Sequence, residues 1–147
     1  METRLASAAD AGLLAALHAE SFGSARWTEA QFADSLALAT SEAWIVLANG
    51  TPQGFILCQF VEGDAEILTL CVTPLVRRKG IARHLLATLV AAAHQRNAQH
   101  VFLEVAVDNR AALALYKAED FQPAGKRANY YRRDGRLIDA VMLRLDL

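Results

Sequence analysis

The stretch Val72-Thr73-Pro74-Leu75-Val76-Arg77-Arg78-Lys79-Gly80-Ile81-Ala82 decides how this chain is interpreted. It leaves an apolar run, turns through three consecutive cations and enters a helical pattern through Gly80. Free backbone amides at a helix start and the positive end of the helix dipole together form an anion site. Gly80 lets a ligand approach the backbone closely. The segment predicts a pyrophosphate cradle; the alternative is a solvated basic turn ahead of an ordinary helix.

Other phosphate-binding loops do not fit this turn. A Walker loop needs an earlier glycine at a fixed spacing and a Lys-Ser or Lys-Thr pair after the last glycine, and neither is present around Gly80. The three-glycine dinucleotide-binding pattern is absent as well. A phosphate at this turn must therefore be bound in another way.

Regular elements extend from the turn in both directions. The expected strands are residues 3–6, 43–48, 54–61, 66–72, 101–107, 126–131 and 138–145, and the expected helices are residues 8–20, 81–96 and 110–119, with another starting at Thr28. Asn49-Gly50 and Gly63-Asp64 suit antiparallel hairpins. Strands in both halves with helices crossing between them predict an α/β fold, with a single mixed, mostly antiparallel sheet flanked by helices.

Length and composition favour one small globular protein. At 147 residues, without repeats or linkers, residues 1–147 are expected to form a single domain. A net charge of −1 gives no bulk attraction to DNA or to an anionic membrane. Cys58 and Cys71 lie in apolar runs and are expected to be buried thiols in a reducing compartment. We therefore expect a cytoplasmic protein, monomeric or weakly dimeric, with no DNA or membrane partner.

The basic turn also carries a family resemblance. Residues 77–82, Arg-Arg-Lys-Gly-Ile-Ala, resemble the Gln/Arg-x-x-Gly-x-Gly/Ala signature of the GNAT acetyltransferases. This resemblance implies the GNAT fold and acetyl-CoA as cosubstrate, with the loop amides on the pyrophosphate. The implied coenzyme-binding residues are Leu70, Cys71, Val72, Arg77, Arg78, Lys79, Gly80, Ile81, Ala82 and Asn109.

Within this family the chain is most similar to the bacterial ribosomal-protein alanine N-acetyltransferases. The similar segments are Trp27-Thr28-Glu29, Leu103-Glu104-Val105, Ala114-Leu115-Tyr116, Asn129-Tyr130-Tyr131 and Asp139-Ala140. The chain departs from that group at Arg26, Asp120 and Ile138, where proline, glycine and an acidic residue are expected. The resemblance implies that the acceptor is a protein or peptide N-terminus, in that group the alanine of a ribosomal protein.

Acetyl transfer to an amine requires a base for the ammonium group and an acid for the departing thiolate. Glu104 is a carboxylate in an apolar strand, so it must be paired, exposed at a strand end or used in chemistry. The resemblance implies that Glu104 is the base. Glu66 is the second candidate, because it resembles the fourth-strand glutamate of the histone-type members; otherwise it is a surface residue after a turn.

Four further residues have both a structural and a functional interpretation. Tyr116 is a core tyrosine on a helix or, by the resemblance, the acid that protonates the thiolate. Asn109 caps the helix that starts at Arg110, and by the resemblance it also binds the coenzyme. Tyr130 and Tyr131 are strand residues that the resemblance assigns, together with Trp27, to the acceptor groove.

The remaining charged and polar groups suggest no second site. Five basic residues near the C-terminus are expected to be solvated surface: Lys126, Arg127, Arg132, Arg133 and Arg136. The alternative is that this cluster contacts a coenzyme phosphate or ribosomal RNA. The four histidines show no metal-ligand spacing, so no metal is expected. Two other functions remain open: acetylation of a lysine side chain or small amine, and coenzyme A binding without catalysis.

Overall fold

The computed structural model describes residues 1–147 and contains one seven-stranded sheet, with strand order β1-β2-β3-β4-β5-β7-β6. The strands are β1 (Glu2–Leu5), β2 (Ser41–Ala48), β3 (Thr51–Val61), β4 (Asp64–Val72), β5 (His100–Ala106), β6 (Gln122–Arg133) and β7 (Arg136–Asp146). All neighbouring strands are antiparallel except β4 and β5. The predicted mixed, mostly antiparallel sheet is therefore confirmed.

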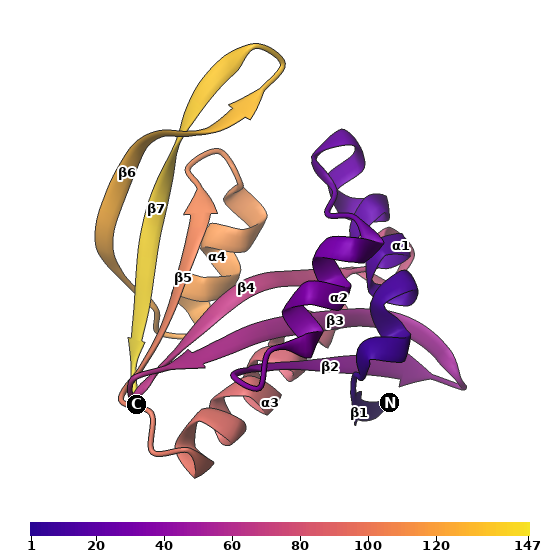
Figure 1. The fold of residues 1–147 in the computed structure, drawn as a ribbon. Helices are drawn as coiled ribbons and strands as arrows, with labels where there is room; N and C mark the ends of the chain where they lie inside the picture. Colours follow the sequence, from indigo (N-terminus) through magenta and orange to yellow (C-terminus); the bar gives the residue numbers. More distant parts are fainter.

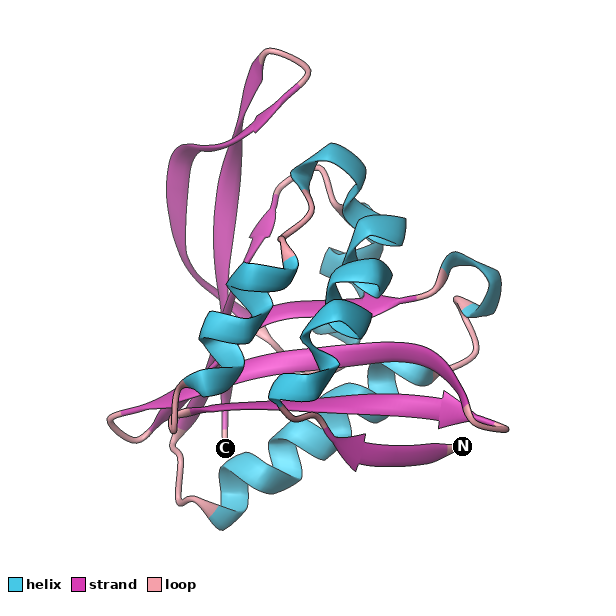
Figure 2. Ribbon diagram, turned by 45° about the vertical axis from the view of Figure 1, so that its right-hand side comes forward, coloured by secondary structure: helices cyan, strands magenta, loops and turns pink.

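Helices cover both faces of this sheet (Figure 2). They are α1 (Ala11–Phe22), α2 (Glu29–Ala37), α3 (Ile81–Gln95) and α4 (Arg110–Ala118), with short 3₁₀ turns at Ala8–Asp10, Gly23–Ala25 and Pro74–Val76. Thr28 caps α2 reciprocally with Gln31: the Thr28 amide donates to Gln31 Oε1 at 2.7 Å, and the Gln31 amide donates to Thr28 Oγ1 at 3.1 Å. None of the helices is both long and apolar enough to cross a membrane.

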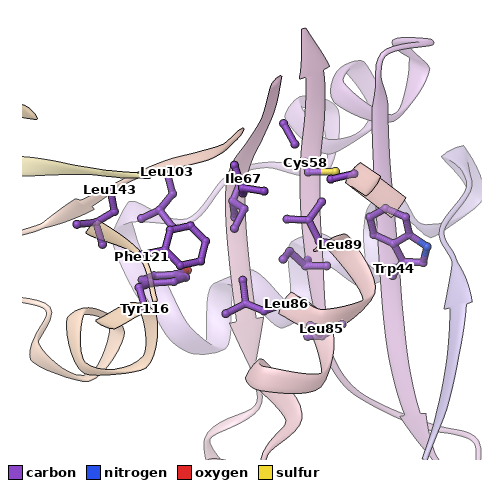
Figure 3. Close-up of a cluster of buried hydrophobic side chains, with 14 of the residues drawn as sticks. Trp44, Cys58, Ile67, Leu85, Leu86, Leu89, Leu103, Tyr116, Phe121 and Leu143 are labelled. Carbon is purple, nitrogen blue, oxygen red and sulfur yellow. The ribbon is translucent and has the colours of Figure 1, made fainter. Parts of the chain in front are cut away.

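Two hydrophobic cores hold the layers together. The larger core lies on the α3 side, where Leu85, Leu86 and Leu89 pack on the sheet (Figure 3). Each leucine contributes about 2 kcal/mol by leaving water. The smaller core lies on the α1 and α2 side and includes the fully buried Phe32 and Phe55.

The turns differ from the sequence-based prediction in two places. Asn49 and Gly50 have φ of 52° and 78°, as expected for the first hairpin. The second turn is formed by Glu62 and Gly63, with φ of 47° and 84°, so the predicted Gly63-Asp64 turn was one residue late. A third turn at residues 134–135, Asp-Gly, joins β6 to β7 and was not predicted.

Strand β6 is longer than the predicted residues 126–131, because it starts at Gln122. Pro123 and Gly125 are residue types that disfavour a regular strand. They are accommodated here because β6 is an edge strand whose register shifts between these two residues. Together β6 and β7 form a long hairpin that projects beyond the body of the protein (Figure 1).

Candidate active site

The parallel strands β4 and β5 separate after a short paired segment. Their register covers only three pairs, from Asp64 with His100 to Glu66 with Phe102. Beyond Glu66 the two strands diverge, and β5 runs toward the projecting hairpin (Figure 1). Leu70, Cys71 and Val72 lie on this separated part of β4. The three residues predicted to line the acetyl arm thus border a gap in which the backbone lacks a neighbouring strand.

The start of α3 carries a run of backbone donors. The Arg77 amide donates to Pro74 and the His84 amide donates to Gly80, but no amide of residues 78–83 donates to a backbone acceptor. Gly80 caps the helix with φ of 80°, and a Cβ added there would meet no atom within 4 Å. Unpaired amides at the positive end of a helix suit a diphosphate. The residues of this loop therefore fit coenzyme A.

Arg77 has a different surrounding from the next two cations. Its Nε donates to the Val72 carbonyl at 3.2 Å, and its Nη2 donates to Ser21 Oγ at 3.0 Å. These contacts tie the loop to the end of β4 and to α1. Arg78 and Lys79 are exposed. The loop is thus held by one cation, while its amides have no backbone acceptor and the two following cations are exposed.

Tyr116 lies on α4 and is only 6% exposed. Its ring packs edge-on against Phe121 at 5.3 Å between centroids, with the hydroxyl on the side of Ile67 (Figure 3). Burial raises the pKa of Tyr116 above its usual value, and the charge of a Cys71 thiolate would raise it further. Tyr116 belongs to the larger core on the α3 side of the sheet, whereas Cys71 packs in the smaller core on the α1 and α2 side.

The two ends of α4 each carry a polar residue with a local structural role. Asn109 caps the helix, because its Oδ1 accepts the Ala112 amide at 3.2 Å, so the predicted N-cap is confirmed. Asp120, which stands where glycine is expected, has φ of 70°. Glycine adopts this conformation most easily, and aspartate tolerates it better than most other residues. The departure from the family pattern therefore leaves the turn intact.

A cavity of about 470 Å³ lies beside the segment in which β4 and β5 pair. Its lining residues are Val61, Glu62, Asp64, Ala65, Glu66, Phe102, Leu103, Glu104, Arg127 and Met142. Both candidate bases are therefore in one cavity. Glu104 Oε1 lies 3.0 Å from Arg127 Nη2, whereas Glu104 Oε2 is buried without a hydrogen-bond partner. Glu66 is exposed and forms no ion pair.

Two tyrosines of β6 lie beside this ion pair. The guanidinium carbon of Arg127 is 4.4 Å from the ring centroid of Tyr130, and the rings of Tyr130 and Tyr131 are 4.9 Å apart. Burial raises the pKa of Tyr131, and the nearby Tyr130 and Glu104 add to the effect. The structure thus brings Tyr130 and Tyr131 together with Glu104.

Trp27 is outside this group. It packs against Phe32 at 5.3 Å and His18 at 5.5 Å between ring centroids, in the core of α1 and α2. It is not among the residues that line the 470 Å³ cavity. Its assignment to the acceptor groove therefore stays a prediction.

The basic cluster near the C-terminus is more than solvated surface. Three of its members are paired: Arg127 with Glu104, Lys126 with Asp139 at 3.1 Å, and Arg133 with Asp108 at 2.7 Å. Sequence reasoning missed Arg127, because its partner is on another strand and no local pattern indicates the pairing.

No group of three or more His, Cys, Asp and Glu side chains is arranged to hold a metal ion. Both cysteines are buried, as predicted, and burial raises the pKa of Cys58 and of Cys71 to about 12. Neither thiol is therefore an ionised nucleophile near neutral pH.

Comparison with known proteins agrees with this geometry. The model of the acetyltransferase (GNAT) family matches residues 13–121. This chain belongs to the GNAT acetyltransferase family. Like other members, it is an N-acetyltransferase that uses acetyl-CoA.

Characterised GNAT relatives cover most of the chain. It is 33% identical over 125 residues to the ribosomal protein bS18-alanine N-acetyltransferase of Escherichia coli K12, covering 82% of this chain and 81% of that protein. It is 36% identical over 143 residues to the N-alpha-acetyltransferase RimI of Mycobacterium tuberculosis H37Rv, covering 94% and 87%. The predicted similarity to the ribosomal-protein alanine N-acetyltransferases is therefore confirmed.

Solved GNAT structures share the whole fold. The crystal structure of the ribosomal-protein-S18-alanine N-acetyltransferase from Escherichia coli has a TM-score of 0.85 at 29% identity, covering 99% of this chain and 94% of that one. Arabidopsis thaliana NAA60 in complex with acetyl-CoA has a TM-score of 0.85 at 20% identity, covering 99% and 98%. The second likeness concerns the fold alone.

Proposed function

We propose that this enzyme acetylates the N-terminal α-amine of a protein, and that this protein is a ribosomal protein beginning with alanine. We propose further that the reaction takes place in the cytoplasm. The support is the identity of 33% to 36% with relatives named for alanine or N-alpha acetylation. The pKa of the acceptor also favours an α-amine. An α-ammonium titrates at about 7.7–8.0 and a lysine at about 10.4, so deprotonation at neutral pH costs roughly 3.5 kcal/mol less for the α-amine.

Glu104 is the proposed base, acting through water. The observation that carries this assignment is its divided carboxylate: Arg127 holds Oε1, and Oε2 is left without a protein partner. A buried acceptor without a partner is costly, and such atoms are usually satisfied by water or by a ligand. The ammonium proton passes through water to Glu104, and the neutral amine attacks the thioester carbonyl carbon.

Tyr116 is the proposed acid. When the carbon–sulfur bond breaks, the thiolate of coenzyme A receives the phenol proton. The phenolate then takes the extra proton that the attacking nitrogen still carries, which leaves a neutral amide. Burial keeps Tyr116 protonated at every pH where the enzyme works, because its pKa is raised.

Glu66 and a lysine acceptor remain the alternatives. Glu66 lines the same cavity, but its carboxylate is exposed and lacks the ion pair that orients Glu104. A more exposed carboxylate is a less oriented base, which is why we place Glu104 first.

Mass spectrometry of a peptide panel tests the proposal. Acetyl-CoA is incubated with an alanine-initiated peptide, the same peptide with serine or glutamate first, and a copy with a blocked N-terminus and an added lysine. We expect acetylation of the α-amine, fastest on the alanine peptide. Acetylation of only the blocked lysine peptide would overturn the N-terminal assignment, and equal rates on all free N-termini would overturn the alanine preference.

A further inference from the structure

Strand β6 is irregular next to the proposed acceptor site. Arg127 is opposite Ala140 and Tyr131 is opposite Ile138, so residues 128–130 face the single residue Asp139. Asn129, in the middle of this bulge, has φ of 54°. Bulges are common beside active sites, where they change the direction of the flanking side chains.

Asp139 contacts the bulge with one carboxylate oxygen and a residue before the bulge with the other. Its Oδ1 accepts the Asn129 amide at 2.8 Å, and its Oδ2 lies 3.1 Å from Lys126 Nζ. The Asn129 amide, followed by Lys126, lowers the pKa of Asp139 below its usual value. Its backbone carbonyl also accepts the Val107 amide at 3.0 Å, which connects the bulge to the end of β5. Asp139 therefore contacts the middle of the irregular segment, the strand before it and the end of β5.

The bulge lies between the residues that surround Glu104. Arg127 precedes the bulge and reaches Glu104 at 3.0 Å, and its guanidinium stacks on Tyr130 at 4.4 Å. Tyr131 follows the bulge, and its ring lies 4.9 Å from the ring of Tyr130. A regular strand would carry two fewer residues here and would move Tyr130 and Tyr131 relative to Arg127.

We propose that Asp139 is a positioning residue for the acceptor site: it holds the β6 bulge that brings Arg127, Tyr130 and Tyr131 to Glu104. This proposal rests on the proposed function, because it takes the cavity beside Glu104 as the place where the acceptor amine binds. Asp139 lines neither the coenzyme loop nor the gap between β4 and β5. Its loss should therefore affect the acceptor and leave acetyl-CoA binding unchanged.

Three variants separate the contacts of Asp139. Asp139→Ala removes both side-chain contacts. Asp139→Asn keeps an oxygen for the Asn129 amide but loses the charge that faces Lys126. Lys126→Ala removes only the ion pair. The KM values for the acceptor peptide and for acetyl-CoA are measured for each variant, and hydrogen exchange of the Asn129 amide is followed by NMR.

We expect Asp139→Ala to raise the acceptor KM about tenfold, the effect of one lost hydrogen bond to a charged group, with an unchanged KM for acetyl-CoA. Exchange of the Asn129 amide should become faster. Asp139→Asn should restore most of the acceptor KM and most of the amide protection, and Lys126→Ala should resemble the wild type. An unchanged acceptor KM in Asp139→Ala, or equal losses for both substrates, would overturn the proposal.

The test of Asp139 can be distinguished from the test of the proposed function. If the wild type acetylates lysine and not the α-amine, the same comparison is made with the lysine peptide. If Glu104→Gln stays active while Asp139→Ala loses acceptor affinity, the base assignment fails and the positioning role stands. Unchanged protection of the Asn129 amide in Asp139→Ala would overturn the role of Asp139 whatever the acceptor is.

Discussion

The carboxylate of Glu104 divides its two oxygens between different surroundings: Oε1 lies 3.0 Å from Nη2 of Arg127, and Oε2 is buried without a partner. An unsatisfied buried acceptor costs about 1–3 kcal/mol. The ion pair orients the carboxylate, and Glu104 lines the cavity that it shares with Glu66. The enzyme thus holds its candidate base before the acceptor arrives.

This arrangement predicts a pH-dependent defect in Glu104→Gln. With an α-amine acceptor, kcat/KM should fall by roughly a hundredfold or more at pH 6–7, the usual contribution of a general base. The loss should shrink above about pH 8, because the amine deprotonates unaided. A lysine acceptor titrates at about 10.4, so with it the defect should persist over this range. A pH–rate profile on both peptides makes the measurement.

Glu66→Gln is the matched control, since Glu66 lines the same cavity without an ion pair. Its profile should follow that of the wild type. If Glu66→Gln shows the pH-dependent loss and Glu104→Gln does not, the two glutamates must exchange roles.

Tyr116→Phe should lower kcat by roughly a hundredfold and leave the Kd for acetyl-CoA nearly unchanged. The phenylalanine ring keeps the packing on Phe121, so the variant should fold normally. Because the raised pKa of Tyr116 keeps the phenol protonated, its titration should produce no basic limb below about pH 10 in the wild-type profile. Steady-state kinetics and calorimetry test these points, and an unchanged kcat would reduce Tyr116 to a packing residue.

Gly80→Val should weaken coenzyme A binding about tenfold or more, because it puts a branched side chain beside the free amides and strains a backbone with φ of 80°. Gly135→Val is the matched control. Gly135 has φ of 75° in the β6–β7 turn, and a Cβ there also meets no atom within 4 Å. Calorimetry on both folded variants should show a loss of coenzyme A affinity only for Gly80→Val. Equal affinities would remove the loop from the coenzyme site.

Acid should destabilise the protein through His18, which is 2% exposed and stacked on Phe22 at 4.2 Å between ring centroids. Burial lowers the pKa of His18 from 6.5 to about 4. Between these values only the unfolded chain binds the proton, so the free energy of unfolding falls as pH drops through this window and is constant above it. The loss is on the order of 3 kcal/mol.

Urea denaturation at pH 7.5, 5.5 and 4.5 measures this effect. His18→Asn is the comparison, because asparagine keeps an acceptor for the Trp27 amide, which donates to His18 Nδ1 at 3.0 Å, but does not titrate. The difference in the free energy of unfolding between wild type and variant should become smaller toward pH 4.5. Parallel curves would show that His18 does not cause the acid sensitivity.

Local patterns in the sequence indicated most of the regular elements and a candidate anion site at the start of α3. Contacts between residues three or four positions apart determine helix α3, the cap at Asn109 and the capping box of Thr28. Such residues are close in the sequence as well as in space. Gly80 and the basic turn before it indicated an anion site for the same reason: one short segment supplies all the donors.

Only the tertiary structure decided the acceptor side. The pairing of Glu104 with Arg127, the shared cavity of Glu66 and Glu104, and the bulge held by Asp139 depend on strand order and register across distant segments. A shift of one residue in a strand reverses the direction of every side chain, and sequence spacing does not fix that register. The sequence therefore determined the fold and the coenzyme chemistry, and packing of β5, β6 and β7 determined which charged groups meet beside the gap.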